Sequence, residues 1–432
     1  MPQLIWRALR THPWLMWLSL ALLFSSVANG LTYVIVFARL LSSQATPISL
    51  TLAWMLTLAP GLPASYIAVK LLCRQPAFQV LLIGETINLC GLIFPLLALQ
   101  FDSPLLLLIS QSTGAIASGF AVPVLSHLFK QGLRQEWMPA AAGIETLSFA
   151  ANVIFGVGIG ILLYGTFSLW SLLLLDTLSA VLAIVLLIKA GRLFTPHDQT
   201  IPPKPVNRLD WRQLSPLQIR SLLLLPCLAL VGTPAMALLP ILTHRLPGES
   251  DDNGLLLLFA RSIGQLLIPL LFLPSEKTAQ RLRISPLLLA LLCFILCYFL
   301  VTLTSSIWLA GLWVIIAHLF SNAVYIIATY SVMRNIDQQL VGSAMAASWR
   351  LQVMITLVMS IITGLLASCI PAQWALLVLG LSGLLLAIVI LSYLPVRIRL
   401  NSTGQPERRL NHASKAENDD NKHLLRQNET EK

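Results

Sequence analysis

Three acidic residues lie inside long apolar segments of this chain: Glu85, Glu145 and Asp176. A carboxyl group placed within a membrane must be hydrogen-bonded, paired with a cation or used to carry protons, because a lone charge there is expensive. Glu145 comes near the beginning of its segment, and for it a proton-coupling role and a structural role are both open. For Glu85 and Asp176 we expect structural carboxyl groups that pack through hydrogen bonds.

Two arginines, Arg261 and Arg350, also lie inside apolar segments. A guanidinium keeps its charge, so each must pair with an acid, bind an anionic substrate or face water. Arg261 and Gln265 are four residues apart and share one face of a helix. There, binding of a carboxylate or catecholate substrate and a structural ion pair are equally open. Arg350 lies as deep in its segment as Glu145, which suggests a gate between the two; the alternative is that each pairs elsewhere.

The composition excludes a water-soluble globular protein. Of 432 residues, 56% are hydrophobic and 11% are charged, against about a quarter charged in soluble domains. The net charge of +10 comes from residues scattered over short loops, which does not fit nucleic-acid binding. The six cysteines form no metal-ligand pattern and no ATP-binding loop is present. We therefore expect no metal, no cofactor, no nucleic acid and no enzyme activity.

Apolar windows long enough to cross a bilayer recur along the chain. Helices are expected, because the backbone polar groups of a membrane-spanning segment must be satisfied within it. The fold class predicted is an all-α integral membrane protein with twelve transmembrane helices in two six-helix pseudo-symmetric halves. The predicted spans are 14–38, 48–69, 77–99, 104–128, 139–163, 166–188, 221–243, 254–274, 286–303, 307–332, 343–367 and 373–394.

Basic residues predict the orientation of these spans. With the N-terminus inside, sixteen Lys and Arg residues before the tail fall in cytoplasmic segments and two fall on the opposite side. Both termini are therefore expected in the cytoplasm. The predicted division is an N-terminal half at 1–188, a proline-rich cytoplasmic linker at 189–220, a C-terminal half at 221–394 and a disordered cytoplasmic tail at 395–432.

Three local patterns resemble the major facilitator superfamily, and in particular its drug and siderophore exporter branch. Residues 134–160 are similar to the fourth loop and fifth helix of that branch, 174–179 to its sixth helix, and 334–342 to its tenth loop. The loop between the second and third helices departs from the family pattern, because residues 68–74 contain neither an acid nor a glycine. Only part of the interhelical clamp of the family can therefore exist.

The fifth span keeps part of the antiporter signature of the resembled branch. Gly156, Gly158 and Gly160 are present, while Val157 stands in the proline position and Asn152 replaces an earlier glycine. The resemblance also implies that the first, fourth, seventh and tenth helices line a central cavity. Polar residues on these helices are then the candidates for substrate binding, with hydrogen bonding between helices as the alternative. Together with Arg261 and Gln265, they are Asn29, Tyr33, Gln111, His318, Asn322 and Tyr325.

We therefore expect a secondary active transporter that exports a small organic molecule, siderophore-like or drug-like, by proton antiport with alternating access. Its expected partners are that small-molecule substrate, protons and the lipid bilayer of a bacterial inner (plasma) membrane, in which the chain acts as a monomer. The alternatives are an importer or facilitator of a small metabolite, and a non-transporting membrane scaffold or lipid-handling protein.

Overall fold

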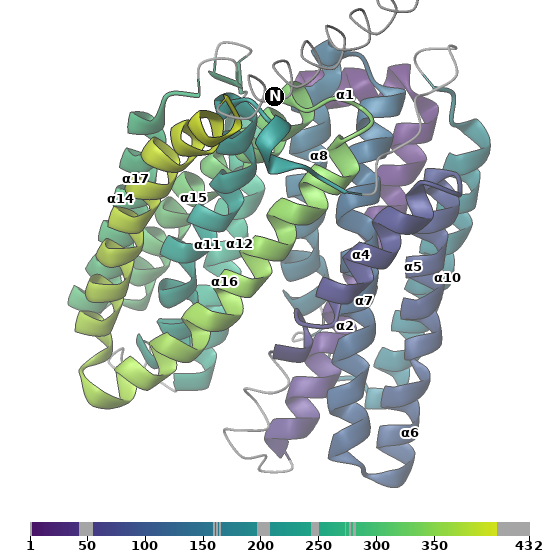
Figure 1. Cartoon of the computed structure of the whole chain (residues 1–432). Helices are drawn as coiled ribbons and strands as arrows, with labels where there is room; N and C mark the ends of the chain where they lie inside the picture. Colours follow the sequence, from purple (N-terminus) through teal and green to yellow (C-terminus); the bar gives the residue numbers. More distant parts are fainter. Residues whose placement is uncertain are drawn as a thin grey trace, which may run out of the picture.

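The computed structural model of the chain is a bundle of helices (Figure 1). Within the described residues it contains no strand. The described residues are 2–42, 55–158, 160, 163, 166–196, 208–242, 250–272, 274–275, 278–279 and 282–403.

The helices form two groups that follow each other in the chain. Each group has its own hydrophobic core, and the core of the first group also takes in residues of α15, such as Ile326 and Met333. After the short helix α1 (Pro2–Thr11), the first group consists of α2 (Pro13–Ser42), α4 (Gly61–Leu72), α5 (Ala77–Gly91), α6 (Ile93–Phe101), α7 (Pro104–Gly132), η1 (Gln135–Trp137), α8 (Met138–Ala151), η2 (Asn152–Gly158) and α10 (Leu169–Leu193). After η3 (Trp211–Gln213), the second consists of α11 (Pro216–Leu242), α12 (Ser250–Leu271), α14 (Ile284–Leu303), α15 (Ile307–Asn335), α16 (Val341–Cys369) and α17 (Ala372–Thr403).

Nine segments in the described part of the chain are long and apolar enough to cross a membrane. Two shorter apolar helices, Gly61–Leu72 and Leu256–Leu271, lie at the second and eighth predicted spans. The fifth predicted span, 139–163, contains α8 followed by the π-helix η2. The chain is thus an integral membrane protein, and the count of twelve spans remains a prediction.

Two of the predicted boundaries need correction. Helix α17 continues past the predicted end of the last span to Thr403, so the first nine residues of the predicted tail are helical. The end of the apolar segment is therefore not the end of the helix. Residues 404–432 lie outside the described residues. The predicted linker is shorter than expected, because α10 ends at Leu193 and α11 begins at Pro216.

A close crossing inside the first group explains one of its glycines. A β-carbon on Gly30 of α2 would lie 2.3 Å from the Gly156 Cα in η2, so only glycine fits there. Across the same contact, Asn152 Nδ2 donates to the Ser26 carbonyl oxygen at 3.2 Å, and Ser26 Oγ donates to the Ser148 carbonyl oxygen at 2.9 Å. The wide π turn is therefore held against α2 by backbone contact as well as by polar side chains.

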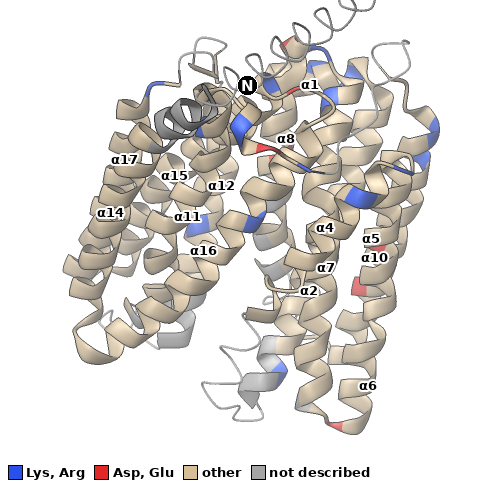
Figure 2. Ribbon diagram, in the orientation of Figure 1, with Lys and Arg blue, Asp and Glu red and all other residues tan. Residues whose placement is uncertain are grey.

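Most Lys and Arg residues gather at one end of the bundle, the end that also carries the N-terminus (Figure 2). We call it the basic end; it includes the ends of α7 and α15 with Lys130 and Arg334. The first and second groups lie side by side and come together near the basic end, while in Figure 1 their ribbons diverge toward the opposite end. The polar bonds between the groups show how this contact is made.

Candidate functional site

Two of the three acids in the membrane are held by hydroxyl groups of α2. Ser25 Oγ donates to the Glu85 carboxyl group, with Oε1 at 2.8 Å and Oε2 at 3.0 Å. Thr32 Oγ1 donates to Oδ2 of Asp176, whose other oxygen is buried and has no hydrogen-bond partner. Ser25 and Thr32 are seven residues apart and therefore lie on one side of α2. Both acids thus join α2 to its neighbours inside the first group.

Glu145 lies where the first group meets the second. It is buried on α8, which packs against α12 and α15. Its carboxyl group interacts electrostatically with Tyr325 of α15, and its Oε2 has no hydrogen-bond partner. Glu145 is therefore the one of the three acids whose surroundings come from both groups.

Arg350 is also at the boundary between the groups, but it does not contact Glu145. Its Nη1 donates to Ser65 Oγ at 3.2 Å, and its guanidinium lies 3.7 Å from the ring centroid of Tyr66. Both partners are on α4 of the first group. The proposed Glu145–Arg350 ion pair is absent from the described residues in this arrangement. Equal depth in two helices does not fix the direction of a side chain around each axis, and α16 presents Arg350 to α4.

Polar bonds between described residues of the two groups include three at or near the basic end. One is the Arg350–Ser65 bond. In the second, Lys130 Nζ of α7 donates to the Met333 carbonyl oxygen in the last turn of α15, at 2.6 Å. In the third, Arg334 Nη1 donates to Gln135 Oε1 at 3.2 Å. Lys130 thus satisfies a carbonyl group that the helix leaves unpaired at its C-terminus.

Sequence reasoning missed this contact of Lys130 because the acceptor is a backbone carbonyl. The only signal available was the occurrence of Lys130 and Arg334 at corresponding places, each in the last turn of a long helix. The structure shows that the two residues bond in opposite directions across the boundary between the groups.

Arg261 lies in the middle of α12, close to three aromatic polar residues. Tyr33 of α2 and Tyr298 of α14 are near enough for their hydroxyl groups to interact electrostatically with its guanidinium, and His318 of α15 is a further neighbour. Tyr298 Oη and His318 Nε2 are 2.8 Å apart and share a hydrogen bond. Tyr298 was missed from the sequence because it lies in an otherwise apolar segment. We call Arg261, Tyr33, Tyr298 and His318 the Arg261 cluster.

The polar stripe predicted on the tenth span is mostly buried. His318 is 3% exposed and Asn322 is 6% exposed. Asn322 Nδ2 donates to the His318 carbonyl oxygen at 2.8 Å, and Ser321 Oγ lies 3.3 Å from His318 Nδ1. Tyr325, the third member, lies beside Glu145. Bonds of this kind favour packing for His318 and Asn322, while their predicted role in substrate binding stays a proposal.

The three remaining predicted residues have separate surroundings. Asn29 of α2 faces α7, where its Oδ1 lies 3.2 Å from the place of a β-carbon on Gly114. Gln111 is buried and its Nε2 has no hydrogen-bond partner. Gln265, one turn after Arg261, is buried as well, and its Oε1 has no partner. Gln111 and Gln265 therefore each keep an unused polar atom inside the membrane.

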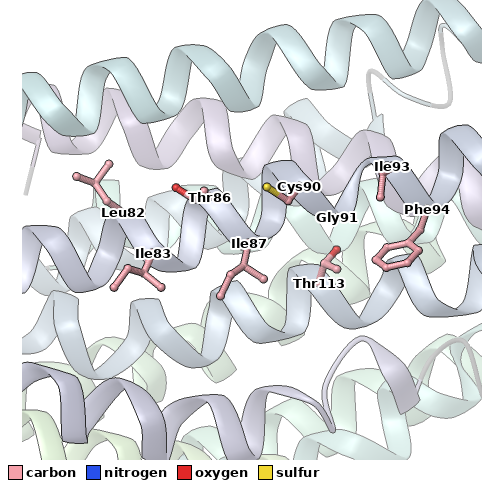
Figure 3. Close-up of a pocket in the computed structure, with 9 residues that line it drawn as sticks. All are labelled: Leu82, Ile83, Thr86, Ile87, Cys90, Gly91, Ile93, Phe94 and Thr113. Atoms are coloured by element: carbon pink, nitrogen blue, oxygen red, sulfur yellow. The ribbon is translucent and has the colours of Figure 1, made fainter.

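A hollow of about 530 Å³ lies beside the break between α5 and α6, and none of the predicted site residues belongs to its lining. Figure 3 shows that its lining comes from these two helices and from Thr113 of the neighbouring α7. The lining contains no charged residue, so the hollow suits apolar groups such as lipid chains. Its residues are Leu82, Ile83, Thr86, Ile87, Cys90, Gly91, Ile93, Phe94 and Thr113.

Comparison with solved structures shows the fold. The human organic anion transporter MFSD10 (TETRAN) has a TM-score of 0.67 at 14% identity, covering 87% of this chain and 98% of that chain. The Escherichia coli fucose:proton symporter FucP has a TM-score of 0.57 at 13% identity, covering 88% and 98%. A bacterial homologue of the iron transporter ferroportin, in an outward-facing state, has a TM-score of 0.59 at 15% identity, covering 87% and 98%.

All three similar structures are major facilitator superfamily transporters and none is an enzyme. The chain therefore has the major facilitator fold. No family model matches the sequence. An uncharacterized 29.9 kDa protein in the crtE 3′ region of Pseudescherichia vulneris is 43% identical over 65 residues, which are 15% of this chain and 24% of that protein. The chain thus spans about a quarter of the length of that curated relative.

Proposed function

We propose that this protein is a secondary active transporter that exports a small organic molecule, siderophore-like or drug-like, by proton antiport with alternating access. The observation that carries the proposal is the set of polar bonds that Lys130, Arg334 and Arg350 make between the groups at or near the basic end. The proposal takes this end to be cytoplasmic and the arrangement to be the one that is closed toward the cytoplasm.

These bonds suit a contact that opens and closes. Each joins one group to the other, and the acceptors are a backbone carbonyl, an amide and a hydroxyl group, all of which water can replace. Separation at the basic end would break these bonds and the contacts of α15 with the core of the first group, while most of each hydrophobic core stays within its own group. Two arrangements of nearly equal free energy are what alternating access requires.

Proton coupling is assigned to Glu145. It is buried on α8, which packs against helices of the second group, and one of its oxygens has no hydrogen-bond partner among the described residues. Opening of the basic end would let water reach this carboxyl group, so that it gives up or takes up a proton there. Glu85 and Asp176 are less suited, because α2 holds both inside the first group.

Two alternatives have observations in their favour. A similar structure is a fucose:proton symporter, so an importer driven by the same gradient uses the same fold. A lipid-handling protein would use the apolar hollow beside α5 and α6. The polar bonds between the groups favour transport over a scaffold, since a scaffold has no need for a contact that can separate.

The first test measures alternating access directly. Spin labels at the exposed residues Glu136 and Gln339 report on the basic end, and labels at Leu105 and Trp308, which are 65% and 76% exposed, report on the opposite end. In the full chain in lipid nanodiscs, a change of pH should lengthen one distance while it shortens the other. Glu145→Gln should abolish this pH response. If both distances stay constant between about pH 5 and about pH 9, a range in which buried carboxyl groups titrate, the result would favour the scaffold.

The second test measures direction and energy source. Inside-out membrane vesicles acidified by respiration should accumulate 2,3-dihydroxybenzoate, a siderophore-like probe, or ethidium, a drug-like probe, without ATP. An uncoupler should abolish the accumulation, and vesicles with Glu145→Gln should resemble vesicles that lack the protein. Uptake into right-side-out vesicles alone would show an importer instead, and uphill uptake that survives the uncoupler would exclude proton antiport.

A further inference from the structure

Arg261 is a cation within the membrane that has no acidic partner in the described part of the chain. Among the described residues, no carboxylate oxygen lies within 4.0 Å of its guanidinium. Its Nε is buried and makes no hydrogen bond. The three acids of the membrane-spanning segments are engaged elsewhere, with Ser25, Thr32 and Tyr325. Within the described residues, the positive charge of Arg261 is therefore not paired with an acid, and the side chain is partly exposed rather than fully buried.

The described neighbours of Arg261 are neutral polar groups. Tyr33, Tyr298 and His318 surround it with hydroxyl groups and an imidazole. Tyr298 is fully buried and bonded to His318 Nε2 at 2.8 Å, so both side chains are fixed. A β-carbon on Gly264 would lie 2.5 Å from the Ile315 carbonyl oxygen, which shows that α12 and α15 are in close contact beside the Arg261 cluster.

A charge within the membrane is costly unless an anion or water reaches it. A guanidinium does not lose its proton in a protein, and a buried charge without a partner strongly destabilises its surroundings. Surrounding dipoles compensate only in part. Hydroxyl groups and a fixed guanidinium fork are, in addition, the donors that bind carboxylate, sulfonate or phosphate oxygens. The chemistry of the Arg261 cluster therefore fits an anion that comes and goes.

We propose that the Arg261 cluster binds the anionic group of the transported molecule, so that the substrate is a small organic anion. This inference rests on the proposed function and names its substrate class. Arg261 supplies the charge from the second group, and Tyr33 supplies a hydroxyl from the first. Gln265, whose Oε1 has no partner, lies one turn away and is placed to accept from a donor of the same molecule. A substrate held by Arg261 and Tyr33 touches both groups at once.

The experiment measures how the purified full chain binds three anions, each with a single aromatic ring. They are benzoate, phenyl phosphate and benzenesulfonate. Benzamide is the uncharged counterpart of benzoate. At least one anion should raise the thermal unfolding midpoint and show saturable binding, while benzamide should not. Arg261→Gln should weaken binding of that anion about ten- to a hundredfold, the range expected for loss of a charged hydrogen bond. Arg261→Lys should keep part of the affinity, and Arg192→Gln, at an exposed arginine of α10, should keep all of it.

The outcomes separate this inference from the proposed function. If none of the three anions binds more tightly to the wild-type chain than to Arg261→Gln, the anion site is wrong. Equal binding of benzamide and benzoate would also overturn it. The response of the spin-label distances to pH is measured without an added anion and is assigned to Glu145, so alternating access can be present when the anion test fails. If Arg261→Gln does not fold, the comparison between Arg261→Lys and the wild type carries the test.

Discussion

Loss of the Lys130 ammonium should shift the molecule toward an arrangement that is open at the basic end. Lys130 Nζ lies 2.6 Å from the Met333 carbonyl oxygen and 3.5 Å from that of Arg334. A hydrogen bond from a charged donor contributes about 1.5–3 kcal/mol, and a cation at a helix C-terminus adds about 0.3–1 kcal/mol. Because Lys130 is only half-buried, solvent screening lowers the sum.

A total of about 1.5 kcal/mol changes an equilibrium constant about tenfold. The variant Lys130→Met keeps the length of the side chain and removes the charge. For spin labels at Glu136 and Gln339, the ratio of the long-distance population to the short-distance population should be about ten times higher in this variant than in the parent protein. Lys70→Met is the matched control, because Lys70 is an exposed lysine at the end of α4.

Two outcomes would refute the reasoning about Lys130. The first is an identical distance distribution for Lys130→Met and Lys70→Met, which would mean that the bond to α15 does not stabilise closure. The second is a shorter distance in Lys130→Met, which would mean that burying the ammonium costs more than the bond returns. Lys130→Arg, which keeps the charge, should fall between the parent protein and Lys130→Met.

Two further predictions concern packing inside the first group. Gly30→Ala should lower the free energy of unfolding by about 1–3 kcal/mol, because the added β-carbon would overlap the backbone of η2. Thermal unfolding should show no such loss for the control Gly232→Ala, where no described atom lies within 4 Å of the added β-carbon. Thr32→Val should cost about 1–3 kcal/mol because the buried Asp176 loses the hydroxyl group that, within the described part of the chain, donates to it. Thr177→Val, which removes a bond to a carbonyl of its own helix, should cost less, and equal losses would contradict the role given to Thr32.

The fold could be predicted largely from the sequence because membrane-spanning helices depend on one strong signal, the length of an apolar run. The spans at 307–332 and 343–367, for example, coincide closely with α15 and α16. The signal fails where it fades gradually. Helix α17 runs past its apolar part, and the fifth predicted span changes from an α-helix to the π-helix η2 at Asn152, which the apolar pattern alone does not reveal.

The candidate site was predicted less completely, for reasons of direction and of backbone chemistry. The sequence singles out Arg261 and Arg350 because a cation in an apolar run is rare. It cannot give the partner of Arg350, since each residue turns a helix by about 100° and the rotation of α16 against its neighbours is set by packing. The partner of Lys130 is a carbonyl oxygen, and every residue has one. The place of Tyr298 in the site follows from its hydrogen bond to His318 in the structure and not from the sequence.

The positions of Lys130 and Arg261 connect closure of the basic end with occupation of the anion site. Lys130 stabilises only an arrangement in which α7 reaches the end of α15. In that same arrangement Tyr33 of the first group lies beside Arg261 of the second. An anion bound by Tyr33 and Arg261 would therefore stabilise the same arrangement as Lys130 does. A ligand shifts an equilibrium only by the difference in its affinities for the two states.

If the anion binds the closed arrangement more tightly, Lys130→Met should weaken anion binding, although Lys130 lies at the basic end. The anion should then restore the short Glu136–Gln339 distance in that variant. An anion affinity unchanged by Lys130→Met would mean that the anion binds both arrangements equally, so that the Arg261 cluster selects the substrate without helping to close the basic end.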